Sequence, residues 1–373
     1  GAIIGAVLMG AGVWGIFASF SAVALFMTCV AFALIFMPLR DRGETDGPRV
    51  FMSTRRIFEY MAGIMGAFFA MNILLQGDVV ILKGLLHDVS RDALQEHYGS
   101  WGLSLVQRWF PGGAKLEPLM LAPELSSSLT GIYAGTRNIT MIPYQGIIPL
   151  TFVVFPVLSA ASFRGDDYQS TRLVRGAIRF AILLVCALCG ALVLSEDIIL
   201  SLLFGSLYGA GKAFLVPMAV GTLSFALYVV LTSMLTAAGY PGRVMVIGLC
   251  ASAAHLGLMT LSAQLEGLPF ERAVHIAWAS ALGPLVGTLM VAYVLKKKLG
   301  VSLPWLSLFR ALSTSFLVTW AVIQWVPLDG ILDLGLRFIV YLSLILASWV
   351  AVGELRRAEA QQLLRFLGRK VEP

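Results

Sequence analysis

The chain has 373 residues, of which 58% are hydrophobic and only 13% are charged, and its mean hydropathy is +0.85. Soluble domains average about 45–50% apolar and about 25% charged residues, so this composition excludes an ordinary soluble enzyme, a disordered protein and a disulfide-rich scaffold. The net charge is +6, but the basic residues are scattered at the ends of apolar segments, so nucleic acid is not an expected partner.

Apolar segments of membrane-spanning length recur along the chain and predict an all-α, polytopic membrane protein. Window hydropathy predicts about nine transmembrane helices. They are expected near residues 12–38, 57–82, 131–158, 176–195, 213–237, 243–263, 273–295, 307–326 and 334–353. Residues 1–10 are typical of the end of a preceding helix, and they begin with Gly1 inside an apolar run. We therefore expect that the natural N-terminus is not part of this chain.

The distribution of Lys and Arg predicts the orientation of the loops. Most of the 27 basic residues lie in or beside residues 40–56, 162–175 and 296–306 and the tail 354–373. The positive-inside rule places these segments, and thus the C-terminus, in the cytoplasm. The long loop 83–130 is then expected outside. Within it, residues 90–110 predict a helix that lies in the outer interface or packs as a lid, and the tail predicts a basic surface helix.

Few ionisable side chains fall inside the predicted spans, and each is a candidate functional group because a charge in a bilayer is costly. Asp78 lies about one turn inside the outer end of the second span, and Arg137 about two turns inside the outer end of the third. Consecutive spans are antiparallel, so the two groups share a depth. They form either an ion pair that only joins two helices or part of a ligand site. Glu59, Arg272 and Arg337 are expected to extend toward the interfaces.

Polar side chains accompany Arg137 in its span. Thr140 and Tyr144 follow it by three and seven residues, on the same helix face, and Asn138 and Gln145 flank that face. The span also contains three prolines, which are typical of helices that line a cavity. An arginine beside hydroxyl and amide groups suits a phosphate or sugar ligand.

The second span contributes a polar pair, Asn72 and Gln76, which are four residues apart. Such a pair either lines a ligand site or forms hydrogen bonds between helices. No histidine is paired with a carboxylate at metal-ligand spacing, so no metal site is expected. Cys186 and Cys189 are expected to be buried small hydrophobic residues. Because no catalytic or nucleotide-binding motif is present, we expect neither an enzyme nor a cofactor.

Three segments resemble elements of a known family. The run Gly131-Ile-Tyr-Ala-Gly-Thr-Arg137-Asn-Ile-Thr-Met-Ile-Pro143, continued by Val154-Phe-Pro-Val-Leu-Ser159, resembles the eighth helix of polysaccharide and lipid-linked oligosaccharide flippases. These belong to the multidrug/oligosaccharidyl-lipid/polysaccharide exporter superfamily. The segment 202–210 looks like the element after their ninth helix, and 233–241 looks like the turn after their tenth. In the lipid II flippase branch, the position of the helix-eight arginine corresponds to Asn138 here, one residue after Arg137.

The resemblance implies a division of the chain, because these flippases have two lobes of six helices around a central cavity. The implied parts are the last helix of the first lobe with the end of the preceding one (1–40), a cytoplasmic inter-lobe loop (41–56), the second lobe with its outer loop at 83–130 (57–295), two additional C-terminal helices (300–353) and a basic cytoplasmic tail (354–373). The helices at 57–82, 131–158 and 213–237 are expected to lie side by side around a polar concavity.

The resemblance also implies a function: flipping an undecaprenyl-diphosphate-linked oligosaccharide across the bacterial inner membrane by alternating access. Two alternatives stay open, a cation-coupled multidrug exporter of the same fold and a membrane polysaccharide polymerase or ligase that uses the loop 83–130. Expected partners are the lipid-linked oligosaccharide, membrane lipids and, in an ion-driven mechanism, a coupling cation. The expected substrate-binding residues are Arg137, Asn138, Thr140, Tyr144, Gln145, Asn72, Gln76 and Asp78.

Overall fold

The computed structural model describes residues 54–97, 118–165, 167–195, 198–265, 269–326 and 331–354, together with Ala22 and Leu25. The chain divides into two units, Gly1–Ser53 and Thr54–Pro373, and the fold below is that of the second unit. Apart from Ala22, Leu25 and Glu354, the expected span 12–38 and the expected tail helix lie outside the described residues.

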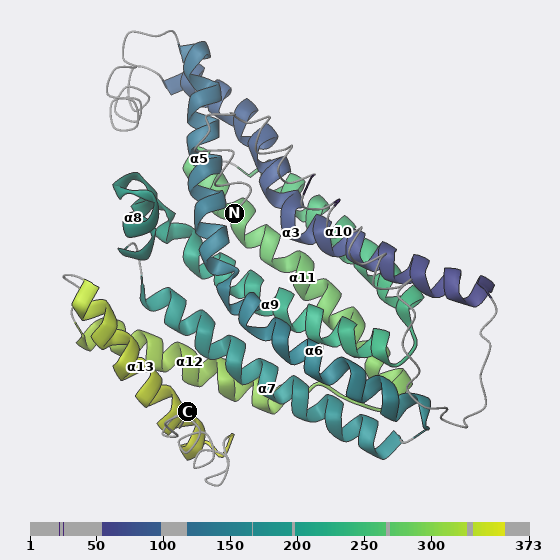
Figure 1. The fold of residues 1–373 in the computed structure, drawn as a ribbon. Helices are drawn as coiled ribbons and strands as arrows, with labels where there is room; N and C mark the ends of the chain where they lie inside the picture. Colours follow the sequence, from purple (N-terminus) through teal and green to yellow (C-terminus); the bar gives the residue numbers. More distant parts are fainter. Residues whose placement is uncertain are drawn as a thin grey trace. The chain divides into compact units, whose positions relative to one another are not determined.

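The described part of the second unit is helical throughout and contains no strand (Figure 1). Its elements are α3 (Thr54–His97), α5 (Pro118–Thr140), α6 (Ile142–Phe163), α7 (Asp167–Leu194), α8 (Ile198–Phe204), η3 (Ser206–Gly211), α9 (Lys212–Ala237), α10 (Pro241–Ser262), α11 (Pro269–Leu299), α12 (Trp305–Trp325) and α13 (Ile331–Ala351).

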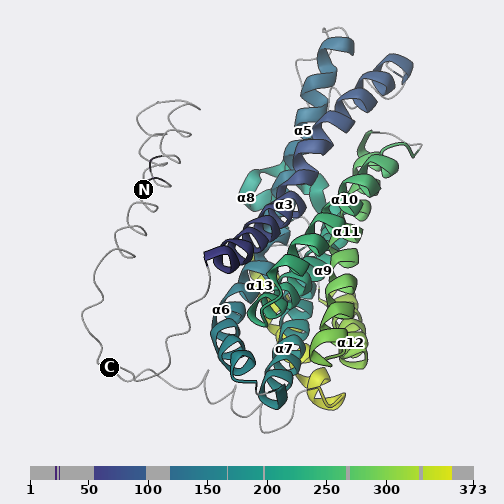
Figure 2. The same ribbon diagram turned by 90° about the vertical axis from the view of Figure 1, so that its right-hand side faces the viewer.

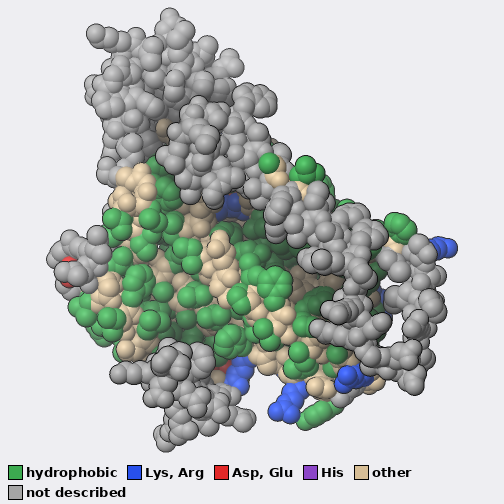
Figure 3. Space-filling model, viewed as in Figure 1, with side chains coloured by type: hydrophobic (Ala, Val, Ile, Leu, Met, Phe, Trp, Pro, Cys, Tyr) green, Lys and Arg blue, Asp and Glu red, His purple; other side chains and the backbone are tan. Residues whose placement is uncertain are grey.

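Eight segments in the described residues are long and apolar enough to cross a membrane. They coincide with the eight spans predicted after 12–38, so the prediction of an all-α, polytopic membrane protein is confirmed. In Figure 3 hydrophobic side chains cover the middle of the visible face, and most of the visible Lys and Arg side chains lie along its lower and right-hand edges. A belt of apolar side chains bounded by basic ones is the surface expected of a membrane protein.

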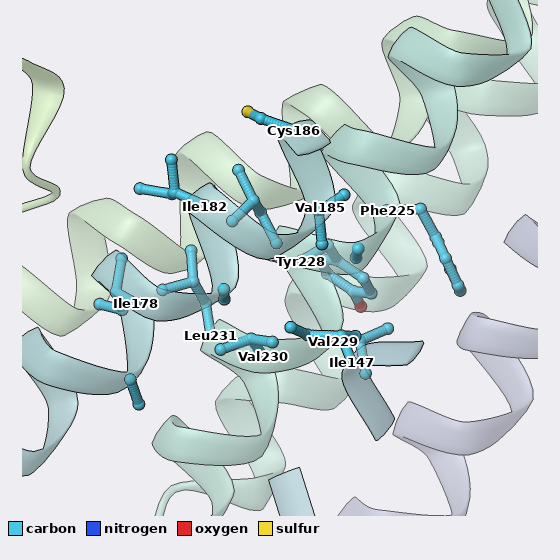
Figure 4. Close-up of a cluster of buried hydrophobic side chains, with 14 of the residues drawn as sticks. Ile147, Ile178, Ile182, Val185, Cys186, Phe225, Tyr228, Val229, Val230 and Leu231 are labelled. Carbon is cyan, nitrogen blue, oxygen red and sulfur yellow. The ribbon is translucent and has the colours of Figure 1, made fainter. Parts of the chain in front are cut away.

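Helix α9 forms the core of this unit because it is apolar on all sides, with only a small difference between its faces. It packs against α5, α6, α7, α10 and α11, and Figure 1 shows it between the α3/α10 pair and the α7/α12/α13 group. Figure 4 shows part of the resulting cluster, in which Ile147 of α6 and Ile178 and Ile182 of α7 surround Tyr228 and Leu231 of α9.

The expected span 131–158 lies within one apolar membrane segment, Ser126–Phe163, in which the single residue Met141 separates α5 from α6. The cause is local: Pro143 has no N–H, so the carbonyl of Ile139 loses its usual helical partner. Met141 keeps a right-handed helical conformation, its N–H donates to the carbonyl of Arg137 at 3.0 Å and its carbonyl accepts from the N–H of Gln145 at 3.1 Å, so the segment has a proline site but no full break. The two halves have different neighbours. Helix α5 packs against α3, whereas α6 packs against α7, and both contact α9.

The second predicted span is also longer than expected. Helix α3 continues past residue 82 to His97 and packs against α5, and the two helices lie side by side in both views (Figures 1 and 2). The described residues of the segment 83–130, which are 83–97 and 118–130, are therefore helical. No separate helix begins at residue 90, because residues 90–97 belong to α3, and residues 98–110 of the expected surface helix lie outside the described residues.

Helices α12 and α13 are joined to α7 by buried hydroxyl groups. The Ser315 hydroxyl donates to the carbonyl of Cys186 at 2.8 Å, and the Tyr341 hydroxyl donates to the carbonyl of Ala187 at 3.0 Å. Gly190 makes this approach possible, because a Cβ there would lie 2.2 Å from the Tyr341 oxygen. Small residues at helix contacts and hydroxyl hydrogen bonds are the usual means by which helices associate in a membrane.

Two charged residues connect α13 to its neighbours. The first is Arg337, which was expected to extend toward an interface. Arg337 does not extend to the interface, since only 4% of it is exposed. Its guanidinium donates to the carbonyls of Val326 at 2.8 Å and of Leu194 and Ile323 at 3.4 Å each. These carbonyls lie at the C-terminal ends of α12 and α7, where helical partners are missing and cations are favoured.

The second is Glu354, which follows the end of α13. It was expected at the start of a surface helix, but it is 3% exposed. Its carboxylate lies 3.4 Å from Arg310 of α12 and 3.4 Å from Arg179 of α7, and its carbonyl accepts a hydrogen bond from Arg179. Gly353, with φ 79°, turns the chain so that this residue faces inward. The other expected interfacial residues, Glu59 and Arg272, are exposed and partly exposed.

Candidate functional site

The two ionisable groups singled out in the sequence meet inside the protein. Asp78 of α3 and Arg137 of α5 are 3% and 6% exposed, and the Nε of the arginine lies 2.6 Å from the Oδ2 of the aspartate. Arg137 Nη2 also donates to the carbonyl of Leu74 at 3.4 Å. An ion pair buried among helices is stable only when its remaining polar atoms also find partners.

The carboxylate of Asp78 has such partners on both oxygens. The hydroxyl of Tyr133, one turn before Arg137 on α5, donates to Oδ2 at 3.1 Å, and the backbone N–H of Val79 donates to Oδ1 at 2.8 Å. The Tyr133 oxygen also lies 3.3 Å from the hydroxyl of Ser280 on α11. The carboxylate of α3 is therefore bound by two side chains of α5, and Tyr133 links this group to α11 through Ser280.

Arg137 stands in the last turn of α5, six residues before Pro143. Its own carbonyl accepts hydrogen bonds from the Thr140 hydroxyl at 2.9 Å and from the Met141 N–H at 3.0 Å. The helical ladder therefore continues past Arg137, and the first carbonyl that loses its helical donor is that of Ile139, because Pro143 has no N–H.

A small cavity of about 30 Å³, here called the charged cavity, lies beside the ion pair. Its lining residues are Leu74, Asp78, Tyr133, Arg137, Thr140, Met141, Met218, Gly221, Thr222, Phe225, His255, Ser280 and Pro284. Two buried polar atoms of this lining, Thr222 Oγ1 and His255 Nε2, have no hydrogen-bond partner among the described residues. Buried polar atoms without a partner are rare, so these two indicate a ligand or water position.

The orientation of His255 is well defined. Its Nδ1 lies 3.1 Å from the carbonyl of Ser280, and the ring sits against Gly283 of α11, where a Cβ would approach the His255 Cβ to 2.4 Å. A carbonyl oxygen can only accept, so Nδ1 carries the proton and donates it. In the neutral ring, Nε2 is then a bare acceptor at the charged cavity.

A second and larger cavity of about 500 Å³, here called the apolar pocket, lies along α3, α6 and α9. It is lined by Ile64, Ala67, Phe68, Met71, Tyr144, Ile148, Thr151, Phe152, Phe155, Pro156, Tyr228, Val229, Thr232, Ser233, Thr236 and Val244. The three helices expected around a concavity therefore do line one pocket, but its walls are mostly apolar rather than polar. Hydroxyls such as those of Thr151 and Thr232 donate to carbonyls of their own helices.

The two cavities are one helical turn apart on the same three elements. Leu74, Met141 and Phe225 line the charged cavity, whereas the apolar pocket is lined by residues three positions away on each element, Met71, Tyr144 and Tyr228. Between them the rings of Tyr144 and Phe225 meet edge to face, with centroids 4.9 Å apart. Because Phe225 lines the charged cavity and Tyr144 lines the apolar pocket, this aromatic contact joins the linings of the two cavities.

The structure brings together only part of the predicted site. Asp78, Arg137 and Thr140 line the charged cavity, and Tyr144 lines the apolar pocket. The remaining four, Asn72, Gln76, Asn138 and Gln145, are exposed and line neither cavity. The Asn72 amide donates to the carbonyl of Phe68 on its own helix. Tyr144 follows Arg137 by two helical turns, which places it in the lining of the next cavity along the segment.

Sequence reasoning missed Tyr133, Thr222 and Ser280, and it noted His255 without giving it a role. His255 carried a usable signal, since it is an ionisable side chain inside a predicted span. Thr222 and Ser280 carried none, because hydroxyl residues are common in membrane helices and usually bond to their own backbone. Within the described residues, no group of three or more His, Cys, Asp or Glu could hold a metal ion.

Comparisons with known proteins give one structural likeness. No protein-family model matches the sequence, and no curated protein matches it. Among solved structures, a chain described as the lipid II flippase MurJ in an inward closed conformation aligns with 80% of this chain and 73% of its own length. The sequence identity is 12% and the TM-score is 0.48.

Proposed function

We propose that this protein is a transporter that flips an undecaprenyl-diphosphate-linked oligosaccharide across the bacterial inner membrane by alternating access. The observation that carries the proposal is the placement of a buried, carboxylate-paired arginine in a membrane segment that also lines a large apolar pocket one turn further along. A lipid-linked diphosphate needs both features, a cation for its phosphates and apolar walls for its chain. The sequence motifs around Arg137, Tyr208 and Gly239 support the same class of substrate.

In the proposed mechanism, Arg137 binds the diphosphate and Asp78 holds the arginine between substrate loads. A lone arginine in a bilayer costs about 2.5–3.5 kcal/mol on insertion scales, so it requires a partner in both states. A diphosphate offers two acceptor oxygens in bidentate geometry and more negative charge than one carboxylate, so it can displace Asp78. In this proposal the Tyr144–Phe225 contact, which joins the linings of the two cavities, opens when the diphosphate moves from the apolar pocket to Arg137.

We further propose that the helices within 57–295 form the second lobe of a two-lobe transporter, with α12 and α13 as additional helices and the C-terminus in the cytoplasm. Cysteine labelling tests the orientation. The native cysteines are replaced, and single cysteines are introduced at the exposed positions Arg164 and Gln264. A membrane-impermeant reagent should label position 264 from outside intact cells and position 164 only after permeabilisation. Labelling of both positions from outside would contradict the orientation.

A vesicle assay tests the transport function. The protein is reconstituted with a fluorescently labelled undecaprenyl-diphosphate oligosaccharide, and dithionite, which cannot cross the bilayer, quenches the label in the outer leaflet only. Flipping should expose label that is protected in protein-free vesicles. Arg137→Ala should remove this exposure, whereas Arg337→Met, at a buried arginine that lines neither cavity, should leave flipping per folded molecule nearly unchanged.

Three other outcomes would contradict the proposal. If Arg137→Ala flips the lipid as fast as the wild type, the ion pair is only a structural contact between α3 and α5. Movement of a cationic drug but not of the lipid would favour the multidrug exporter, and lengthening of the glycan would favour the polymerase or ligase.

A further inference from the structure

The charged cavity has room for a ligand smaller than any lipid headgroup. A bound water needs about 10–15 Å³ of such volume, and the cavity has about 30 Å³. Thr222 of α9 and His255 of α10 are 0% and 1% exposed, and each leaves one polar atom without a partner among the described residues. Helices α9 and α10 contribute no partner to the Arg137–Asp78 ion pair. The ion pair therefore does not explain why these two buried polar atoms have no hydrogen-bond partner among the described residues.

The hydrogen-bonding chemistry of the lining restricts what can bind. Arg137 supplies only donors, and its guanidinium has N–H groups beyond those that bind Asp78 and Leu74. His255 Nε2 is an acceptor, because Nδ1 donates to the carbonyl of Ser280. The hydroxyl of Thr222 can serve as either. A ligand that satisfies all three groups must accept from the arginine and donate to the histidine.

Simple ions do not meet this requirement. A cation in the cavity would lie beside the positive guanidinium of Arg137. Asp78 already balances the charge of this arginine, so the lining offers no further negative charge to balance a bound cation. A halide can accept from Arg137 but has no proton to give to His255 Nε2. Protonating His255 would place a second positive charge beside Arg137 in a buried site, which is costly. The other charged or titratable groups of this lining are Asp78 and Tyr133, and they are already bonded to each other.

We propose that the charged cavity is a binding site for a neutral hydroxyl ligand, occupied by one or two water molecules in this conformation. The water accepts from Arg137 and donates to His255 Nε2, and the Thr222 hydroxyl completes the network. This network joins α5, α9 and α10, in addition to the contacts of Asp78 on α3 with Arg137 and Tyr133 of α5. The binding site itself does not depend on the proposed transport function. If that function holds, the water has a further role, since it solvates Arg137 while the arginine exchanges Asp78 for a diphosphate.

Ion dependence of stability is the first test. The full-length protein is purified in detergent, and its thermal unfolding midpoint is measured in sodium chloride, potassium chloride, choline chloride and sodium gluconate at equal ionic strength. A neutral ligand predicts the same midpoint in all four salts. A rise specific to sodium or to chloride that Thr222→Val abolishes would overturn the proposal and make the cavity an ion site.

Removal of single hydroxyl groups is the second test. Thr222→Val keeps the side-chain shape and should lower the midpoint by about 2–4 °C, the order of shift given by one lost hydrogen bond. Ser170→Ala is the matched control, because its buried hydroxyl also has no partner among the described residues but lines neither cavity. It should leave the midpoint unchanged or raise it. An equal response of both variants would overturn the proposal.

A high-resolution structure gives a direct readout that does not depend on transport. Density is expected within hydrogen-bonding distance of Arg137, Thr222 Oγ1 and His255 Nε2, and it should weaken in Thr222→Val. If the cavity shows no density and the threonine variant is as stable as the wild type, the site is dry and the inference fails. Loss of flipping alone would not bear on this result, so failure of the two proposals can be told apart.

Discussion

Arg137 and Arg337 are both almost completely buried, with 6% and 4% of their surface exposed, yet their guanidinium groups have different surroundings. Arg337 donates to three backbone carbonyls at the ends of two helices. Arg137 pairs with Asp78, an ionisable side chain, and lies beside a cavity with two unpartnered polar atoms. The carbonyls that bind Arg337 are fixed parts of the ends of α7 and α12, whereas a carboxylate side chain can move away and be replaced by another anion.

The comparison shows why burial alone does not identify a functional charge. Buried arginines are costly wherever they occur, so both residues must contribute something that offsets this cost. Arg337 offsets this cost through local hydrogen bonds, because its guanidinium donates to helix-end carbonyls that otherwise lack partners. For Arg137 the partners are replaceable and the space beside it is open to a small ligand. Exchangeable partners, rather than depth, are the feature that separates the candidate site from a structural contact.

The largest expected effect is the loss of flipping in Arg137→Ala. Truncating one partner of a buried, hydrogen-bonded charge pair costs about 2–5 kcal/mol, which corresponds to about 30-fold or more in rate. Arg137→Lys should be intermediate, because lysine keeps the charge but loses the planar fork. The vesicle assay measures both variants at matched protein levels. If both variants fold but are equally inactive, transport requires the bidentate geometry of arginine and a positive charge alone is not sufficient.

The second effect is on stability and concerns Asp78→Asn. This change leaves the guanidinium of Arg137 buried without an opposite charge, and breaking a buried pair costs about 3–5 kcal/mol. We expect a clear loss in the unfolding midpoint but a smaller loss of flipping than in Arg137→Ala, because a substrate phosphate can still bind the arginine. Chemical denaturation and the vesicle assay provide the two values. Complete loss of flipping with normal stability would assign Asp78 a direct role in transport.

A third prediction concerns Arg337, the second of the two buried arginines. Arg337→Met keeps the volume but leaves the carbonyls of Leu194 and Val326 without their donor, at about 1–3 kcal/mol for each unsatisfied group. Unfolding should occur at lower denaturant concentration, while flipping per folded molecule should stay within about twofold of the wild type. A selective loss of flipping in this variant would break the distinction between the two arginines.

The smallest effect is expected for Glu354→Gln. Its partners Arg179 and Arg310 are 34% and 39% exposed, so solvent screens the interaction and we expect a loss of about 1 kcal/mol or less. The backbone contact from Arg179 to residue 354 is kept in this variant. Raising the salt concentration should reduce the difference between the variant and the wild type. A difference that does not depend on salt would indicate a packing effect instead.

The spans were predictable because each is a long apolar run, and the approach of Asp78 to Arg137 was predictable because consecutive helices are antiparallel. The division of the third span at Met141 was not, although Pro143 signals it, because a proline can be accommodated within a helix or can begin a new one. The partners of Arg337 were also hidden, since backbone carbonyls leave no mark in the sequence. Thr222 and His255 join the site only through the packing of α9 and α10, which no local pattern encodes.

The inward-facing Glu354 has a consequence for how the protein is made. The carboxylate that holds α13 against α7 and α12 is synthesised 175 residues after its partner Arg179. Arg179 therefore reaches the membrane long before the residue that pairs with it. In the proposed orientation, its positive charge is available during this interval to retain α7 with residue 179 on the cytoplasmic side. We expect docking of α13 to be a late step, so a stop codon placed before residue 354 should leave α12 and α13 inserted but without the ion pairs to Arg179 and Arg310.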